Sequence, residues 1–201
     1  MTQENIDTGY PMIKREDFFS TIDSLLSPIE IERIETAYIF AKYGHRSQYR
    51  DDGVTRYFEH PRAVAWIIIK ELKLIDWQTI VLALLHDIKE DSYILSWNRI
   101  QINFGRQITI DLKLLTKDPK EGYLERIFSH GSWRVLLVKL CDRLHNLRTL
   151  DKCEISKKEK QIAETIRYYL PLCDILIAKL KKGSKWRGEY LKEAISRCLT
   201  K

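Results

Sequence analysis

The chain has 201 residues, of which 44% are hydrophobic, and its 34 lysines and arginines against 28 aspartates and glutamates give a formal net charge of +6. This length and apolar content suit one compact domain and exclude a largely disordered chain. Membrane insertion is also excluded, because no run approaches the roughly 18 apolar residues that cross a bilayer.

The N-terminal residues and the cysteines indicate the compartment. Residues 1–5 contain neither the basic nor the apolar segment of a secretion signal. The four cysteines are scattered and form no CxxC motif, which is typical of reduced thiols. They are Cys141, Cys153, Cys173 and Cys198. We therefore expect a cytoplasmic protein that makes no contact with membranes.

Apolar residues recur at helical spacing along almost the whole chain, and no segment alternates like a strand. The pattern predicts an all-α fold, a single compact bundle of roughly eight to ten helices. In chain order the helices are expected over residues 14–26, 28–43, 58–73, 77–90, 93–103, 106–116, 121–129, 133–150, 156–182 and after 184.

Capping and breaking residues set the expected boundaries. Residues expected to cap helix starts are Ser27, Asp76, Ser156 and Ser184. Residues expected to separate, bend or end helices are Gly105, Pro171 and Gly183. The chain is thereby divided into a helical extension over 1–27, a main domain over 28–182, and a C-terminal helix over 183–201 that packs on the same domain.

The most informative segment follows the apolar helical run Ile80–Leu85. His86 and Asp87 stand side by side, and Glu90 and Asp91 follow one helical turn later. Buried charge is costly unless it is paired or binds a metal. The segment therefore indicates a divalent-metal hydrolase, in which the later acidic pair could take a proton from the attacking water.

A second polar stripe occurs later in the chain. Asp142, Asn146 and Thr149 share one helical face, and the turns before them are apolar. If this helix packs beside the first one, Asp142 can meet His86 and Asp87. Both helices would then be buried at their start and polar at their end.

A fourth metal ligand is expected at a helix entrance, where His60 precedes Pro61. Two imidazoles and two carboxylates suit Mn²⁺, Fe²⁺ or Zn²⁺ better than Ca²⁺ and leave positions open for water or substrate. His130 and His145 are expected to lie at the surface or behind the ligands. The predicted ligand set is His60, His86, Asp87 and Asp142.

These residues and their neighbours resemble one family. In this order the four ligands form the pattern of the HD phosphohydrolase superfamily. The flanking segments resemble the hydrolase domain of RelA/SpoT proteins over about residues 30–180; they read YFEHPRAVA at 57–65, LLHDIKEDS at 84–92 and KLCDRLHNLRTL at 139–150. An HD pair alone is a weak signal, whereas HDxxED together with DRLHNxRTL is highly specific.

The resemblance implies hydrolysis of (p)ppGpp at its 3′-pyrophosphate with one Mn²⁺ ion, giving GDP or GTP and pyrophosphate. It implies that Glu90 and Asp91 are the catalytic acidic pair. It also implies that the nucleotide is held by Arg50, Asn146 and Thr149. Because no room remains for the family's synthetase or regulatory domains, the chain is similar to the small alarmone hydrolases of the metazoan SpoT type.

Two departures from the family pattern stand out. The loop over 50–57 is one residue longer than usual, and Asp51 replaces a common lysine. This change puts guanine specificity in question more than catalysis. Lys89 stands inside HDxxED where an apolar residue is usual, and we expect it to point away from the ligands.

Other functions remain open at this stage. One alternative enzyme acts on adenine alarmones such as pppApp, or on the 2′-phosphate of NADPH. Another is a basic helical module that senses nucleotide or binds RNA without turnover, since lysines gather at 157–160 and 179–185. The complete ligand set and acidic pair favour an enzyme with a small nucleotide substrate over a nucleic-acid partner. The oligomeric state is not indicated.

Overall fold

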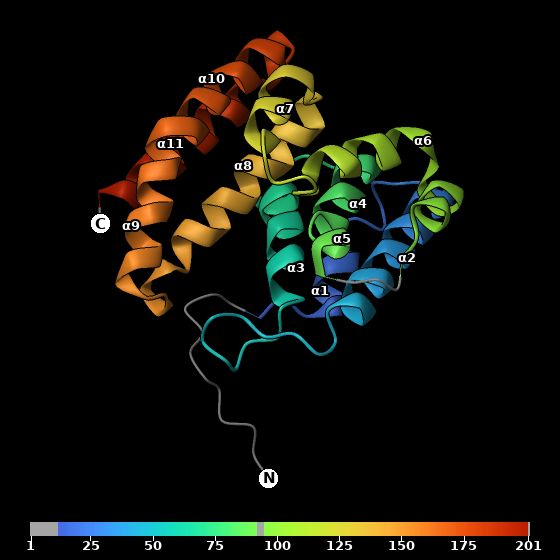
Figure 1. Ribbon diagram of the computed structural model, residues 1–201. Helices are drawn as coiled ribbons and strands as arrows, with labels where there is room; N and C mark the ends of the chain where they lie inside the picture. The colour runs from blue at the N-terminus through green and yellow to red at the C-terminus, as the bar shows by residue number, and fades with distance from the viewer. Residues whose placement is uncertain (1–11, 92–94, 201) are drawn as a thin grey trace.

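The computed structural model describes residues 12–91 and 95–200, and within them it contains helices and no strand beyond one isolated bridge between Tyr49 and Arg56 (Figure 1). The prediction of an all-α fold is confirmed. The α-helices are α1 Arg15–Ser20, α2 Pro28–Gly44, α3 Glu59–Trp66, α4 Trp77–Leu85, α5 Ile88–Asp91, α6 Trp97–Leu115, α7 Tyr123–His130, α8 Trp133–Arg148, α9 Ile155–Glu164, α10 Leu170–Lys179 and α11 Trp186–Leu199.

Two predicted caps start helices as expected. At the start of α2, Glu30 accepts hydrogen bonds from the backbone N–H and the hydroxyl of Ser27, at 2.9 and 2.7 Å. At the start of α4, the Asp76 carboxylate accepts the backbone N–H of Thr79 at 3.0 Å. Each satisfies a donor that the first helical turn leaves open.

The two later cap predictions are wrong. Helix α9 begins at Ile155, after Glu154, so Ser156 already lies inside the helix. The backbone N–H of Ser184 bonds the Lys181 carbonyl in a short 3₁₀ turn, and α11 begins beyond it. In both places a 3₁₀ turn before the helix shifts its start by one or two residues, which the local sequence does not reveal.

Several predicted helices end early or divide. The first stops at Ser20 rather than 26, and the one expected over 77–90 stops at Leu85. Gly105, at φ 86°, separates two halves of α6 as expected, although the part of that prediction at 92–94 lies outside the described residues. The helix expected over 156–182 ends at Lys179 rather than at Gly183.

Two π-helical stretches add turns that the sequence analysis did not predict. One, Ile67–Glu71, continues α3, and the other, Thr165–Tyr169, joins α9 to α10. The second lies just before Pro171, which lacks a backbone donor. The bend expected at Pro171 stays a prediction.

Helices α4 and α8 form the centre of the bundle. Every residue of α4 from Thr79 to Leu85 is buried, because α2, α3, α6 and α8 surround it. Helix α8 crosses the molecule between α3 and α4 on one side and α10 and α11 on the other (Figure 1). A helix that is apolar all round belongs in such an interior. The C-terminal end of α4 and the middle of α8 therefore meet near the start of α3.

The remaining helices cover this centre. Helix α11 packs on α8 and α10. None of the described helices has the length and hydropathy needed to cross a membrane. The division into an extension, a main domain and a C-terminal helix stays a prediction.

Candidate active site

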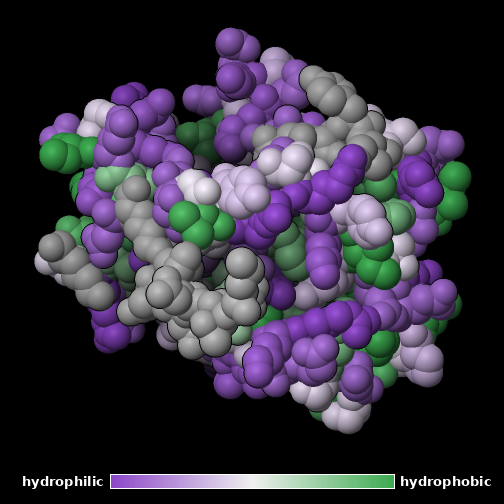
Figure 2. Space-filling model, turned by 90° about the horizontal axis from the view of Figure 1, so that it is seen from below, coloured by the Kyte–Doolittle hydropathy of each residue, from purple (hydrophilic) through white to green (hydrophobic). Residues whose placement is uncertain are grey.

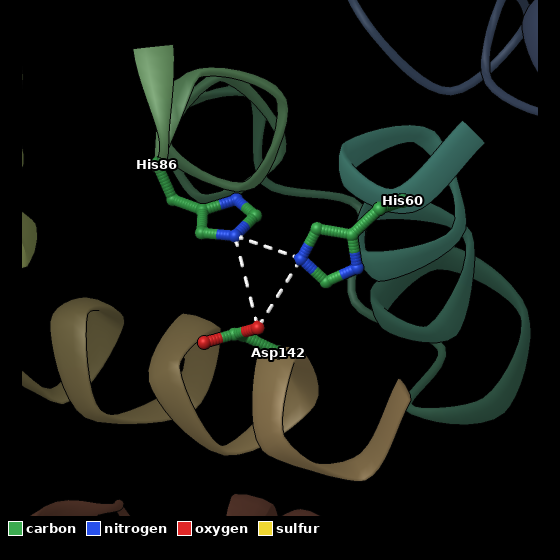
Figure 3. A group of neighbouring side chains, drawn as sticks. All are labelled: His60, His86 and Asp142. Carbon is green, nitrogen blue, oxygen red and sulfur yellow. Dashed lines mark hydrogen bonds and ion pairs between the residues drawn. The ribbon is translucent and has the colours of Figure 1, made fainter. Parts of the chain in front are cut away.

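Three predicted ligands converge from three different helices (Figure 3). His60 lies in the first turn of α3, His86 directly follows α4, and Asp142 lies in α8. The His60 Nε2 atom is 3.2 Å from both His86 Nε2 and Asp142 Oδ1, and His86 Nε2 is 3.9 Å from Asp142 Oδ1. All three side chains are buried. Their ligand atoms lie within 4.8 Å of one another, close enough to hold one ion.

Asp87 lies at the edge of this group. Its Oδ2 atom is 3.0 Å from His86 Nε2 and 3.5 Å from His60 Nε2, and it accepts the Tyr57 hydroxyl at 2.7 Å. The set whose ligand atoms all lie within 4.8 Å of one another does not include Asp87. The structure thus brings Asp87 to both histidines, and its role as fourth ligand stays a prediction.

The hydrogen bonds of the histidines aim their Nε2 lone pairs at the group. His86 Nδ1 lies 2.8 Å from the Ala83 carbonyl, which can only accept, so Nδ1 carries the proton. His60 Nδ1 lies 2.8 Å from His145 Nδ1, and donation from His60 leaves its Nε2 free as well. Burial would lower the pKa of His86, but Asp87 and Asp142 raise it, so positive charge is favoured between these side chains, either as a proton on Nε2 or as a divalent cation bound by it.

Both carboxylates of the group are ionised. Burial by itself would raise the pKa of Asp142, but Lys139 and the two imidazoles outweigh burial and hold that pKa well below its usual range. Burial acts on Asp87 in the same way, and His86 and His60 together hold its pKa well below the usual range. Because ionised carboxylates and imidazoles are the donors that such a site needs, the residues present fit a divalent metal.

Sequence reasoning missed Lys139, which is buried beside the site. Its Nζ atom lies 2.8 Å from Asp142 Oδ2, so Oδ1 of the same carboxylate remains for the histidines. Burial would lower the pKa of Lys139, but the carboxylate of Asp142 raises it well above the usual value. A lysine one turn before Asp142 in an apolar helix is the signal that could have revealed this pair.

His145 and Tyr57 support the ligands from behind. His145 is buried, and burial together with the neighbouring His60 holds its pKa well below the usual value. A neutral imidazole can accept the Nδ1 proton of His60. Tyr57 fixes Asp87 through its hydroxyl, a contact that sequence reasoning missed. Of the two positions expected for His145, the structure has the one behind the ligands and not the one at the surface.

The three residues predicted to hold substrate form one hydrogen-bonded chain. It lies next to His60, His86 and Asp142, which we call the metal group. Arg50 donates to Asn146 Oδ1 at 3.0 Å and to Thr149 Oγ1 at 3.3 Å. Asn146 in turn donates to Asp142 Oδ1 at 2.6 Å. The Arg50 guanidinium is thereby linked to the metal group through a single side chain.

The predicted acidic pair is separated from the ligands by a break in the helix. His86 and Asp87 form a turn between α4 and α5, so the expected continuous helix over 77–90 is wrong here. Glu90, in α5, accepts hydrogen bonds from the backbone N–H and the Nζ atom of Lys117, both at 3.1 Å. The side chain of Asp91 lies outside the described residues.

Lys89 points away from the ligands, as expected. It donates to the Leu95 carbonyl at 2.8 Å and lies over the ring of Trp97. The departure of Lys89 from the family pattern therefore leaves the metal group unchanged.

The loop that carries Arg50 folds back on itself (Figure 1). The Arg50 backbone N–H donates to the Thr55 carbonyl at 2.8 Å, and Asp52 accepts the Thr55 N–H at 2.8 Å. Gly53, at φ 68°, makes the reversal in a conformation that other residues adopt only with strain. This fold holds the Arg50 side chain toward α8.

Comparison with known proteins gives consistent relatives. No protein-family model matches the chain. The chain is 35% identical over 170 residues to the bifunctional (p)ppGpp synthase/hydrolase SpoT of Escherichia coli K12, a match that covers 78% of this chain and 24% of SpoT. It is 36% identical over 183 residues to the guanosine-3′,5′-bis(diphosphate) 3′-pyrophosphohydrolase of Aquifex aeolicus, covering 85% of this chain and 26% of that protein.

These matches relate the chain to one part of longer proteins, because it spans about a quarter of the length of these curated relatives. Among solved structures, that of a metazoan SpoT ortholog described as hydrolysing ppGpp has the same fold, with a TM-score of 0.65 at 24% identity. The alignment covers 82% of this chain and 94% of the ortholog.

Proposed function

Since this chain is a RelA/SpoT-type hydrolase domain in sequence and fold, we propose that it is a Mn²⁺-dependent (p)ppGpp 3′-pyrophosphohydrolase that releases GDP or GTP and pyrophosphate. The buried group of His60, His86 and Asp142 carries this proposal. Relatives named for the same reaction support it. Names that cover both synthesis and hydrolysis do not choose between the two reactions, but a buried group of metal donors favours hydrolysis.

His60, His86, Asp142 and, as the fourth ligand, Asp87 would hold one Mn²⁺ ion. An ion held there supplies positive charge to the pyrophosphate and lowers the pKa of a bound water, to about 7 in the best cases. The mixed imidazole and carboxylate set suits Mn²⁺, Fe²⁺ or Zn²⁺. The choice of Mn²⁺ is part of the proposal, and a titration with each ion tests it.

Arg50 binds the anionic pyrophosphate in this proposal. A guanidinium can make two parallel hydrogen bonds to phosphate oxygens, which positions as well as attracts them. Asn146 and Thr149 already bond this guanidinium and so fix its direction. The hydrogen bond from Asn146 to Asp142 fixes the position of Arg50, Asn146 and Thr149 relative to the metal group.

Two protons must move in the reaction. Water adds to the phosphorus nearest the ribose, the bond from that phosphorus to the 3′-oxygen breaks, and the 3′-oxygen leaves with the electron pair. Water loses a proton and the 3′-oxygen gains one. We assign these transfers to Glu90 and Asp91. Lys117 forms an ion pair with Glu90 at 3.1 Å and so fixes the position of this carboxylate.

The deciding experiment is turnover of ppGpp with Mn²⁺, with and without EDTA, with GDP, pyrophosphate and orthophosphate resolved. GDP plus pyrophosphate that disappears with EDTA supports the proposal. Orthophosphate from NADPH, or turnover of pppApp alone, would change the proposed substrate but not the proposed metal centre. Binding of a nucleotide without any turnover would indicate that the protein is a nucleotide sensor and not an enzyme.

A reducing, cytoplasmic location is part of the same proposal. All four cysteines are free thiols, and two of them are buried. The partner that we propose is a small nucleotide, not a nucleic acid.

A further inference from the structure

A pocket of about 520 Å³ opens between α1, α2 and the loop that leads into α3. None of the residues assigned above to metal, catalysis or substrate lines it. Its volume is in the range of pockets that take small molecules, roughly 300–1,000 Å³. The face that bears the loop is covered largely by hydrophilic side chains (Figure 2). The pocket is therefore a separate site from the metal group.

The rim of this pocket is strongly basic. Lys42, Arg46 and Arg56 line it, and within the described ranges none of them has a carboxylate partner. Arg46 donates to the Tyr43 carbonyl at 3.1 Å, and Arg56 donates to the Arg46 carbonyl at 2.9 Å. Because carbonyls are neutral, the charges remain available to an anion.

The acidic side chain that lines the pocket, Glu59, already has a cationic partner. Glu59 lines the pocket but forms an ion pair with Arg62. Arg62 also donates to the Tyr38 hydroxyl at 3.1 Å and so fixes one wall. The ring of Tyr38 packs edge-on against Phe58, at 4.9 Å between centroids. Tyr38 and Phe58 are only 3% and 5% exposed and close the floor of the pocket, whereas Tyr43, which also lines it, is 65% exposed and offers an aromatic ring beside the cationic rim.

His45 gives the second, independent sign of a ligand. It lines the pocket, is only 1% exposed, and its Nδ1 lies 2.6 Å from the side-chain oxygen of Gln48. Nδ1 therefore carries the proton, and Nε2 is a buried acceptor with no donor among the described residues. A buried acceptor without a donor costs free energy. An N–H or O–H group from a pocket occupant would satisfy it.

We propose that this pocket binds a nucleoside phosphate, separately from the substrate. The phosphates lie at Lys42, Arg46 and Arg56, the ring lies against the exposed Tyr43, and a donor of the sugar or base bonds His45 Nε2. A free phosphate would match the rim alone, whereas a nucleoside phosphate matches the rim, the aromatic wall and the buried acceptor together. The ring of His45 also lies against that of Tyr57, tilted and at 4.7 Å between centroids, and Tyr57 bonds Asp87, so the occupant lies three contacts from Asp87.

The test uses the full chain in EDTA, where the proposed hydrolysis does not run, so its outcome is independent of the proposed reaction. GTP is titrated while the ring nitrogens of His45 are followed by NMR. The expected result is a saturable shift of the His45 Nε2 signal with the same dissociation constant in Arg50→Ala, which weakens the active site only. The paired substitution Lys42→Glu with Arg46→Glu should weaken this binding tenfold or more.

Controls separate the pocket from general charge. Lys181→Glu with Lys182→Glu makes the same charge change on exposed residues far along the chain, and should leave GTP binding intact. Thermal unfolding checks that both paired variants fold. An unchanged His45 signal, or equal binding by the two paired variants, would overturn the proposal. Pyrophosphate bound as tightly as GTP would overturn the assignment of a nucleoside, and pyrophosphate bound tenfold more weakly supports it.

Discussion

Lys157 on α9 donates to both carboxylate oxygens of Asp51, at 2.7 and 2.8 Å, and so ties the loop before α3 to a helix a hundred residues later. The Cys153 thiol also donates to Asp51, at 3.3 Å. The hydrogen bond from Lys157 lowers the pKa of Asp51. Because Asp51 adjoins Arg50, we expect the position of Arg50, which we propose binds phosphate, to depend on this contact.

Breaking this contact should change substrate binding more than stability. Both side chains are nearly half exposed, and such pairs contribute about 0.2–1 kcal/mol. We expect Asp51→Lys to raise the KM for ppGpp several-fold with little change in thermal midpoint. Adding Lys157→Asp should restore KM by re-forming the pair with its charges exchanged. A paired variant with the KM of Asp51→Lys alone would show that the contact does not position the loop.

Arg50 should be irreplaceable by lysine. Both bonds to Asn146 and Thr149 leave from one nitrogen, Nη2, so the rest of the planar guanidinium can bond two phosphate oxygens in parallel, which the point charge of an ammonium does not reproduce. We expect Arg50→Lys and Arg50→Ala both to lower kcat/KM by about 10- to 100-fold, since a charge-assisted hydrogen bond contributes about 1.5–3 kcal/mol. Steady-state kinetics check this, with Arg56→Ala as the matched loop variant. Near-normal activity of Arg50→Lys would contradict the bidentate role.

Different substitutions should abolish metal binding and proton transfer. Asp87→Ala is expected to remove Mn²⁺ binding and turnover together. Glu90→Gln should keep the Mn²⁺ dissociation constant and lose about 10²–10⁴-fold in kcat, because Glu90 bonds Lys117 rather than the ligands. Mn²⁺ binding followed by electron paramagnetic resonance, beside turnover, measures both. Loss of the ion in Glu90→Gln would place Glu90 among the ligands instead.

Lys139 should be needed for the stability of the fold. Removing its charge leaves Asp142 buried and without its cation, and breaking such a pair costs about 3–5 kcal/mol. We expect Lys139→Met to lower the free energy of unfolding by this amount in urea titrations, and Mn²⁺ to recover part of the loss. Lys160→Met, at an exposed position, is the control. Equal stability of the two variants would mean that the pair contributes nothing.

The Asp76 cap should make stability depend on pH. Burial would raise the pKa of Asp76, but Arg134 and Thr79 outweigh it and the folded pKa lies below the ordinary 3.8. The stabilisation is therefore complete above the unfolded pKa and is lost as pH falls through the lower folded value. Asp76→Asn keeps a capping oxygen but loses the charge paired with Arg134, and should lower the free energy of unfolding by about 0.2–1 kcal/mol at pH 7. Urea titrations should show that difference shrinking below pH 3.8; a constant difference would contradict the linkage.

The sequence predicted the features that depend on local chemistry or on burial. Ser27 and Asp76 cap helices because their side chains reach their own first turn. The meeting of His86 and Asp142 follows from burial, since apolar runs precede both residues and must pack together in the interior. His60 joined them because a histidine at a helix entrance faces the same end of the bundle.

Part of what escaped prediction depends on contacts between distant segments. The helix breaks after Leu85, and Glu90 bonds Lys117, and neither feature can be read before α4 and α6 are packed. The pair of Lys139 with Asp142 is local, three residues apart in α8, and was missed for another reason: a lysine is seldom expected in a buried helix. Local propensity also continued the first helix beyond Ser20, where the chain instead turns through bonds from Ile22 and Asp23 to the Phe19 carbonyl.

The turn at His86 and Asp87 has a mechanical consequence. His86 is anchored to α4, the most enclosed helix of the bundle, whereas Glu90 rides on the four-residue α5 near the surface. We therefore expect the proposed ligands to be held rigidly, and the Glu90 carboxylate to move between Lys117 and a bound substrate. Raising the viscosity of the solvent or lowering the temperature should therefore slow turnover while leaving the affinity for the metal ion unchanged.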